Sequence, residues 1–349
     1  MSQSRLDRAL DRRNVLVAGA ALVGTAAIPD TAFGATEPGL APASDLLAAV
    51  RKFTGGLEPD KLKAASFAWN GPEWQSWNYF GIGGFTKPGL RLEQMSAAQK
   101  EAAWGIVGVL MSPAGLAKTR NVMLLQHILA ASGNRASERS SERFSFSVFG
   151  TPAETGAWGF RLEGHHLTHS IAVRDNRIVS VTPASFSALP NRVTGGKHAG
   201  LVTLRDEEAL ARRLMGDLAP KLQARTRASD SALGNILSYA GRERSNAQKV
   251  GLPAAELGSA LGDLLWQLVE TFAVEHLSPM LATAQRARIG SRDRAAAHFA
   301  WYGPSTAEKA FGYRVIGDGF VIELGSVDPA AQHLHTIYHD LGNVLGRAA

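Results

Sequence analysis

The stretch that decides the fold runs from Ser170 to Val181 and reads SIAVRDNRIVSV. Apolar and polar residues alternate on both sides of Asp175-Asn176, which is the pattern of two half-buried strands joined by a tight turn. The run from Tyr313 to Leu324 has the same form, with Gly317-Asp318-Gly319 between two apolar segments. Two such hairpins predict a sheet that is largely antiparallel.

Regular patterns continue outward from these hairpins. Phe144–Phe149 alternates as a further strand, and Gln332–Tyr338 is expected to be extended. Six stretches have helical patterns: Ser44–Phe53 with Ser44 as its cap, Ser96–Met111 behind a capping box, Pro113–Ser132, Asp206–Met215, Pro220–Arg227 and Pro253–Arg288. The helices Ser96–Met111 and Pro113–Ser132 are expected to form an antiparallel pair. The order helices, strands, helices, strands predicts an α+β fold, a single large domain over residues 35–349 with helices packed on the sheet.

The amino-terminal residues have the order of an export signal. Basic residues precede an uncharged apolar run, Asn14–Ile28, which Pro29 ends. That run has about 15 residues, whereas a membrane-spanning helix needs roughly 20, so an anchor is the weaker interpretation. Ala32-Phe33-Gly34 offers the small residues that a signal peptidase requires. We therefore expect residues 1–34 to be removed and the mature protein to lie in the periplasm or outside the cell, without a membrane anchor.

Arg12-Arg13 indicates the export route. The surrounding residues resemble the twin-arginine motif, although Val15 replaces its usual Phe. The twin-arginine translocase is therefore the expected partner for export, and a Sec signal with a chance pair of arginines is the alternative. Because the twin-arginine route carries folded proteins, this signal would fit a protein that acquires a cofactor before export.

Composition excludes several classes of chemistry. The chain has no cysteine, which excludes disulfides, thiolate metal ligands, iron–sulfur clusters and cysteine nucleophiles. Its 37 basic and 31 acidic residues leave a net charge of only +6, and no basic run is interleaved with aromatic residues. We therefore expect no nucleic-acid partner. The aromatic stretch Trp69–Phe85 has two interpretations, a loop packed on the core or an aromatic wall for a ligand.

Histidine clustering is the main functional signal of the mature chain. Six of the ten histidines fall in two short segments: His165, His166 and His169, then His333, His335 and His339. If each segment is a strand, alternate side chains share a face, so His333 and His335 point the same way. In the first segment Glu163, His165 and His169 would then share one face and His166 the other. A helical interpretation is the alternative, since His165 and His169 are four residues apart, as are His335 and His339.

These clusters predict a metal site. Two imidazoles from one strand can bind a single ion, with further ligands from the other cluster. Glu163, on the expected face of His165, and Glu323 are the candidates for a general base or fourth ligand. Glu323 stands in an apolar run, where a charge is costly unless it is paired or ligated. Arg161 either binds an anionic substrate group or pairs with Glu163. The alternative is a polar interior in which the histidines bind only carboxylates and backbone.

The predicted metal is a divalent ion whose identity stays open among Zn, Cu, Fe and Mn. Zinc would favour hydrolysis, through a bound water of lowered pKa, and copper or iron would favour oxygen chemistry. The sequence has no Gly-x-Ser-x-Gly elbow, no Gly-Lys-Ser/Thr phosphate loop and no His-Glu-x-x-His motif. Serine catalysis would need a hydroxyl beside one of the histidines, and Ser170 or Thr168 is the candidate that the spacing leaves open.

Several strings resemble one protein family. They are Phe149–Pro152, Trp158–Leu167 with the sequence WGFRLEGHHL, Thr182-Pro183, and His333–Asp340 with the sequence HLHTIYHD followed by Asn343. Together they resemble the bacterial and fungal proteins of the domain-of-unknown-function 3500 family, over most of the mature chain. The resemblance singles out a set of residues without assigning a reaction: Arg161, Glu163, His165, His166, His333, His335, Asp340 and Asn343.

The tail departs from the family pattern. His339 stands where an arginine is usual, and Val344 replaces an acidic residue. His169 is not part of the motif. The predicted metal ligands are therefore His165, His166, His333 and His335, with Asp340 as a further candidate. We expect an exported metal-dependent enzyme, hydrolytic rather than oxidative, with a small-molecule or peptide substrate. The alternatives are a metal- or ligand-binding protein without turnover and a structural domain with buried histidines.

Overall fold

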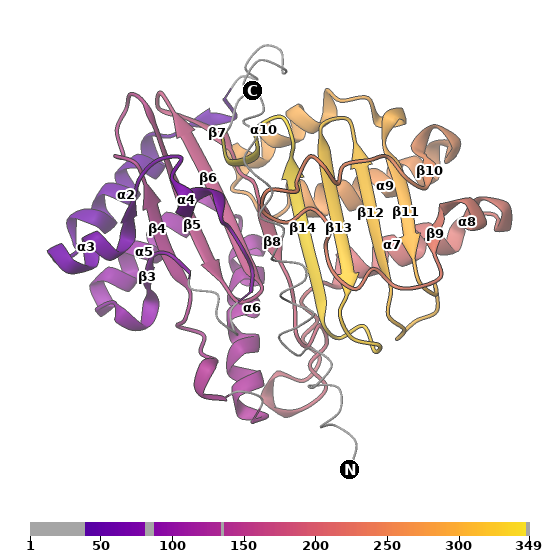
Figure 1. The fold of residues 1–349 in the computed structure, drawn as a ribbon, viewed down its shortest axis with the longest axis horizontal. Coiled ribbons are helices and arrows are strands. Elements are labelled where there is room, and N and C mark those ends of the chain that lie inside the picture. Colours follow the sequence, from indigo (N-terminus) through magenta and orange to yellow (C-terminus); the bar gives the residue numbers. More distant parts are fainter. Residues whose placement is uncertain (1–38, 81–86, 134–135, 347–349) are drawn as a thin grey trace. The chain divides into compact units, whose positions relative to one another are not determined.

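A computed structural model describes residues 39–80, 87–133 and 136–346, which belong to one compact unit. The predicted export signal lies outside the described residues. Within the described part, no helix is both long enough and apolar enough to span a membrane. The fold is α+β, as predicted, with one large and mostly antiparallel sheet (Figure 1).

Fourteen described strands form the sheet. Its main order is β10-β11-β12-β13-β14-β8-β6-β5-β4-β2, and β1, β3, β7 and β9 pair at its sides. Two pairs are parallel, β2 with β4 and β9 with β11. The strands are β1 (Ala41–Pro42), β2 (Ser66–Phe67), β3 (Leu90–Arg91), β4 (Ser145–Phe149), β5 (Ala157–Gly164), β6 (Leu167–Arg174), β7 (Arg177–Ser180), β8 (Ala184–Phe186), β9 (Arg227–Ser229), β10 (Leu252–Pro253), β11 (His298–Tyr302), β12 (Gly312–Gly317), β13 (Phe320–Ser326) and β14 (Leu334–Asp340).

Nine α-helices are described, and in Figure 1 the long helices α2, α5, α7 and α9 lie behind the strands. Their bounds are α2 (Ser44–Gly55), α3 (Pro59–Ala65), α4 (Pro72–Gln75), α5 (Ala97–Leu110), α6 (Pro113–Ala131), α7 (Arg205–Asp217), α8 (Pro220–Thr226), α9 (Gly258–Ala273) and α10 (Pro279–Gly290).

Both predicted hairpins are confirmed. β6 and β7 are joined at Asp175-Asn176, where both residues have positive φ, 47° and 57°. β12 and β13 are joined by Asp318-Gly319, with Gly319 at φ 74°. Asparagine, aspartate and glycine are the residues that adopt this left-handed backbone most readily, which is why the sequence reveals these turns.

The helices require three corrections. α2 is capped by Ala43 rather than Ser44, which is the first helical residue. The predicted pairing of the second and third helices is wrong, because α5 packs mainly against α2. The stretch with a helical pattern from Pro253 to Arg288 starts too early, because Pro253 lies in β10, and it contains two helices, α9 and α10, separated by Val274–Ser278. The capping box that opens α5 is confirmed, with the Ser96 side chain accepting from the Gln99 backbone N–H.

The two faces of the sheet differ in character. Trp158, Phe160 and Leu162 of β5 belong to the hydrophobic core beneath the helices. The alternate residues Arg161 and Glu163 point to the other face. Two covering segments lie on that face: residues 68–80, which contain the short helix α4, and residues 230–250, which are coil. Within these segments and the strands below lies a second core that includes Trp74, Trp77, Tyr79, Phe149, Ile236 and Ile337.

The aromatic stretch therefore has a structural role in its described part. Trp74, Trp77 and Tyr79 are all at most 2% exposed. Their packing favours the interpretation of a loop that covers the core. Tyr79 also reaches the histidines, as described below.

Buried charges on this second face hold the two covering segments in place. Glu323 of β13 accepts hydrogen bonds from the backbone N–H groups of Leu237 and Ser238, and it pairs with Arg314 at 2.8 Å. Arg161 donates to the backbone carbonyls of Glu73 and Trp74. The charged side chains thus satisfy polar backbone groups that would otherwise be buried without partners.

Candidate metal centre

The first histidine segment is not a continuous strand, which corrects the predicted alternation. β5 ends at Gly164 and β6 begins at Leu167, which pair with each other, so His165 and His166 form the turn between antiparallel strands. The reversal puts His169 on the same face as Leu162, not on that of Glu163. Neither turn residue is glycine, proline or asparagine, which is why the pattern gave no sign of a turn.

His166 occupies the turn in a costly conformation. Its φ is +67°, in the left-handed region, which costs a non-glycine residue roughly 1–2 kcal/mol. Its backbone N–H donates to Tyr79 O at 2.8 Å, and its carbonyl accepts from the Ser187 N–H at 2.8 Å. These contacts fix the turn between a coil segment and the β8 region. Such strain is typical of functional positions.

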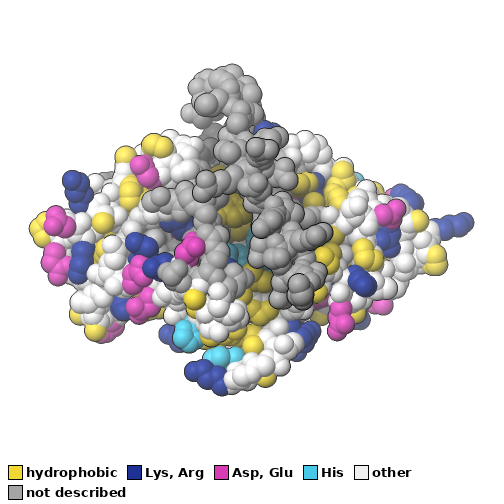
Figure 2. All heavy atoms as spheres, turned by 60° about the horizontal axis from the view of Figure 1, so that its bottom comes forward, with side chains coloured by type: hydrophobic (Ala, Val, Ile, Leu, Met, Phe, Trp, Pro, Cys, Tyr) yellow, Lys and Arg dark blue, Asp and Glu magenta, His cyan; other side chains and the backbone are white. Residues whose placement is uncertain are grey.

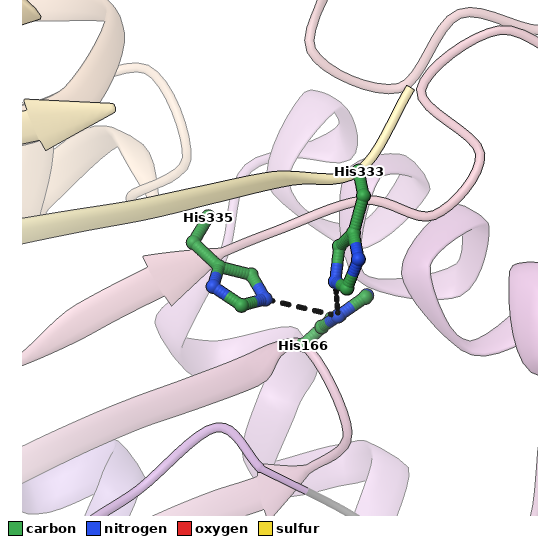
Figure 3. A group of neighbouring side chains, drawn as sticks. All are labelled: His166, His333 and His335. Carbon is green, nitrogen blue, oxygen red and sulfur yellow. Dashed lines mark hydrogen bonds between the residues drawn. The ribbon is translucent and has the colours of Figure 1, made fainter. Parts of the chain in front are cut away.

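The second histidine segment enters and forms β14. His335 lies in the strand and pairs with Gly325 of β13, and His333 immediately precedes the strand. The His333 N–H donates to Asp328 Oδ1 at 2.7 Å, which fixes the backbone just before the strand. The prediction that these two histidines share a face is confirmed, because both rings point toward His166 (Figure 3).

Three imidazoles converge at this point. His166 Nε2 lies 3.0 Å from His333 Nε2 and 3.3 Å from His335 Nε2. One nitrogen from each residue lies within 4.8 Å of the others, so this group could hold a metal ion. A tetrahedral zinc site with Zn–N bonds near 2.0–2.1 Å places its nitrogens about 3.3 Å apart. The two separations from His166 Nε2 are close to that value, and the nitrogens of His333 and His335 lie within 4.8 Å of each other.

Burial keeps these imidazoles neutral. Loss of hydration lowers the pKa of His166 and His335 well below the usual 6.5, and the neighbouring histidines lower them further. Burial also lowers the pKa of His333, to about 4, although nearby Asp328 opposes the shift. A neutral imidazole with a free lone pair is the form that binds a metal ion.

Asn235 determines which nitrogen of His335 faces the centre. Its Oδ1 lies 2.9 Å from His335 Nδ1 and also accepts from the Tyr79 hydroxyl and the Ile236 N–H. Because this oxygen is an acceptor, His335 Nδ1 carries the proton and Nε2 keeps its lone pair. Hydrogen bonds of this kind orient histidine ligands in metal sites. The Tyr79 ring packs on His335 with a centroid separation of 4.8 Å.

His165, a predicted ligand, lies beside the three-histidine group instead of within it. Its ring packs on His166 with centroids 3.7 Å apart. Its Nδ1 lies 2.7 Å from Gln126 Oε1 of α6, and the same oxygen accepts from Arg139 at 3.0 Å. His165 is therefore a neighbour of the centre, next to a guanidinium group.

The remaining histidines and Asp340 lie elsewhere. Asp340 forms ion pairs with Arg292 at 2.8 Å and Arg288 at 3.4 Å. His339 contacts the Ser238 carbonyl at 2.7 Å, and the ring of His169 packs against His276. Of the five predicted metal ligands, the structure thus groups His166, His333 and His335, and it does not place His165 or Asp340 in that group.

The two predicted carboxylates differ in their surroundings. Both oxygens of Glu323 are engaged, by Arg314 and by two backbone N–H groups. Glu163 is fully buried, and its Oε1 accepts from the Asn78 N–H at 2.6 Å and lies 3.8 Å from Lys87 Nζ. Its Oε2 has no partner. Burial lowers the pKa of Lys87 to about 8, and the charge of Glu163 partly opposes this.

Arg161 is fully buried and directed at protein groups. Besides the carbonyls of Glu73 and Trp74, it donates to Ser170 Oγ at 2.8 Å, and it stacks over the Trp74 ring. Burial lowers the pKa of Arg161 to about 10, and nearby Glu163 opposes this shift. These contacts give the guanidinium a role in holding the 68–80 segment.

Sequence patterns did not reveal Asn235, Gln126 or Arg139. Each comes from a different part of the chain, namely a coil, a helix and the connection after that helix. The side chains reach the histidines only through the fold. Their only sequence signal is a polar residue at a position that becomes buried, as for Gln126 at 2% exposure.

Comparison with known proteins gives a family and no function. Searches of curated proteins and of solved structures found no match. One family model, "Protein of unknown function (DUF3500)", matches residues 40–344 and so covers both β5–β6 and β14. The match contains the whole three-histidine centre and nearly all of the described chain, and the protein therefore belongs to the DUF3500 family.

Proposed function

We propose that the protein is an exported metal-dependent enzyme whose ion is held by His166, His333 and His335, and that its reaction is hydrolytic. One observation carries the proposal, the convergence of three buried imidazole nitrogens within 4.8 Å. The predicted periplasmic or extracellular location and the twin-arginine route remain part of the proposal.

Hydrogen bonding alone explains the centre poorly. Because His335 Nδ1 holds its proton toward Asn235, the Nε2 of this residue has none to give. His166 Nε2 approaches two other ring nitrogens, at 3.0 and 3.3 Å, and it carries at most one proton. When all three rings are neutral, a single proton is the most that can serve the two contacts of His166 Nε2, so one of them has no hydrogen bond. A cation accepts all three lone pairs, which favours the metal site over a purely structural polar interior.

The ligand count favours catalysis over a structural ion. Three protein ligands leave a fourth position of a tetrahedral ion for water or substrate, whereas structural zinc sites are closed by four protein ligands. The described residues offer no fourth histidine or carboxylate in the group. His333 is only half-buried, so the centre is not completely enclosed by the described chain. A bound divalent ion would supply Lewis acidity and lower the pKa of a water molecule.

Zinc is the ion we propose first. Imidazole ligands also suit copper and iron, which would support oxygen chemistry. A metal-binding protein without turnover is the alternative outcome. Glu163 is the proposed general base, because its Oε2 is a buried acceptor without a partner. The substrate is proposed to be a small molecule or a peptide.

The test uses the mature chain, purified and dialysed, with zinc content measured by elemental analysis. Wild type is expected to bind one zinc ion, and His333→Ala/His335→Ala none. His127→Ala, an exposed histidine of α6, serves as the matched control and should keep the ion. Equal zinc content in the double variant and wild type would exclude this centre.

Hydrolysis is tested on the same zinc-loaded samples. The probes are p-nitrophenyl acetate and a chromogenic peptide amide. We expect zinc-dependent turnover that falls by 10²–10⁴-fold in Glu163→Gln, the usual contribution of a general base, while zinc content is unchanged. Bound zinc without turnover of either probe would favour the binding protein instead.

A further inference from the structure

A set of polar side chains surrounds His165, on one side of the metal centre. Gln126, Arg139 and His166 each contact this ring: Gln126 Oε1 at 2.7 Å, Arg139 Nη1 at 3.1 Å, and the His166 ring at a centroid separation of 3.7 Å. The side chains come from α6, from the connection after it and from the β5–β6 turn. The fold thus gathers polar groups from three separate segments.

Two of these side chains have buried nitrogens without partners. Gln126 Nε2 and His166 Nδ1 lack a hydrogen-bond partner, although their residues are only 2% and 1% exposed. The amide orientation of Gln126 is fixed by Arg139, because the guanidinium Nη1 only donates and needs the amide oxygen as its acceptor at 3.0 Å. Its Nε2 therefore remains as a donor. An unpaired buried donor costs about 1–3 kcal/mol, so both groups call for an acceptor.

Metal binding makes the His166 nitrogen a donor as well. When Nε2 of an imidazole is a ligand, Nδ1 carries the proton. Arg139 adds a positive charge beside this site. Its Nη1 lies 3.1 Å from His165 Nδ1, and the ring of His165 packs on that of the proposed ligand His166. The site thus combines two unpaired N–H donors, those of Gln126 and His166, with the positive charge of Arg139. This combination favours the binding of an anion.

We propose that Gln126, Arg139 and His166 form an oxyanion subsite beside the metal centre and that the substrate carries a carboxylate or phosphate group bound there. This assignment rests on the proposed function, since it takes the anion to be part of the substrate of that centre. The planar guanidinium of Arg139 matches either group. Gln126 determines the specificity for an anion, because its free Nε2 can only donate.

The experiment measures anion binding by calorimetry on the full mature chain. Sodium acetate and inorganic phosphate are titrated separately into zinc-loaded protein, and the anion that binds more tightly identifies the group as carboxylate or phosphate. The variant Gln126→Glu keeps an acceptor for Arg139 and His165 but replaces the free donor by a negative charge. Arg139→Gln removes the cation. Arg143→Gln is the control, because that exposed arginine pairs with Glu93 instead.

We expect Gln126→Glu and Arg139→Gln each to weaken anion binding by about tenfold or more, the range of a hydrogen bond to a charged group. Zinc content and anion binding in Arg143→Gln should match wild type. Wild-type protein that binds zinc but neither anion, or unchanged affinity in either variant, would overturn the subsite and leave the metal centre intact.

Failure of the metal centre gives a different result. In that case wild type binds no zinc, and the anion titrations are repeated on the same zinc-free protein. Anion binding that still depends on Gln126 and Arg139 would support the subsite without the metal. Its absence would overturn the subsite together with the proposed function.

Discussion

At the scale of single residues, one hydrogen bond sets the direction of a proposed ligand. Asn235 Oδ1 lies 2.9 Å from His335 Nδ1 and accepts the Tyr79 hydroxyl at 2.7 Å. The amide oxygen fixes the tautomer, so that His335 Nε2 faces His166. The proposed metal site therefore includes an orienting residue 100 positions away from the histidine that it contacts.

Replacing Asn235 should change zinc affinity more than it changes folding. We expect Asn235→Leu to weaken zinc binding by about 10–100-fold, as loss of an outer-shell partner usually does. Asn235→Asp keeps the acceptor and should stay near wild type. Competition with a chromogenic chelator gives the dissociation constants. Equal affinity in Asn235→Leu and wild type would show that Asn235 does not orient the ligand.

At the scale of secondary-structure elements, buried charges on the polar face of the sheet hold the two covering segments, residues 68–80 and 230–250. Arg161 of β5 and Glu323 of β13 each bond two backbone groups of a covering segment. Both residues are fully buried. The sequence singled out Arg161 as a candidate for binding an anionic substrate group. It singled out Glu323 because a charge in an apolar strand is costly. The contacts of both side chains indicate a structural role instead, because each one bonds backbone groups that are buried beneath a covering segment.

Arg161→Met should therefore reduce stability and leave the metal centre assembled. Removing the guanidinium leaves the carbonyls of Glu73 and Trp74 without their donors and Glu163 without its positive neighbour. We expect a loss of about 3–5 kcal/mol in the free energy of unfolding, typical of breaking a buried charge interaction. Urea unfolding measures it, with zinc stoichiometry determined in parallel. Wild-type stability together with loss of anion binding would instead support the sequence-based role of Arg161 as the anion-binding group.

The turns between strands show which parts of the fold can be predicted from the sequence. Alternation and the turn residues Asp175-Asn176 and Asp318-Gly319 gave both hairpins, because left-handed backbone favours these residue types. The turn at His165-His166 was missed, since no turn-forming residue marks it. His166, His333 and His335 were found by clustering, but Gln126, Arg139 and Asn235 were not, because only tertiary structure brings them to the site.

At the scale of the whole molecule, the centre links distant parts of the chain. His166 lies at the tip of β5–β6, His335 lies on β14, and His333 immediately precedes β14. The short strand β8 lies between β6 and β14 in the sheet (Figure 1). On the face drawn in Figure 2, basic and acidic side chains of the described residues are interspersed. A bound ion would thus join the two halves of the sheet across β8.

Zinc should accordingly stabilise the folded chain. A ligand that binds only the native state adds about 2.7 kcal/mol at a free concentration 100 times its dissociation constant. We expect the melting temperature of wild type to rise by several degrees in zinc, while that of His333→Ala/His335→Ala stays constant. Calorimetry with and without zinc measures the shift. An equal shift in the double variant would place the stabilising ion elsewhere.

The most direct measurement is a crystal structure of the zinc-loaded mature protein, with anomalous data collected on both sides of the zinc absorption edge. We predict an anomalous peak about 2.0–2.1 Å from Nε2 of His166, His333 and His335, with a non-protein ligand in the fourth position. Well-ordered imidazoles with no anomalous peak between them, from crystals grown with excess zinc, would contradict it.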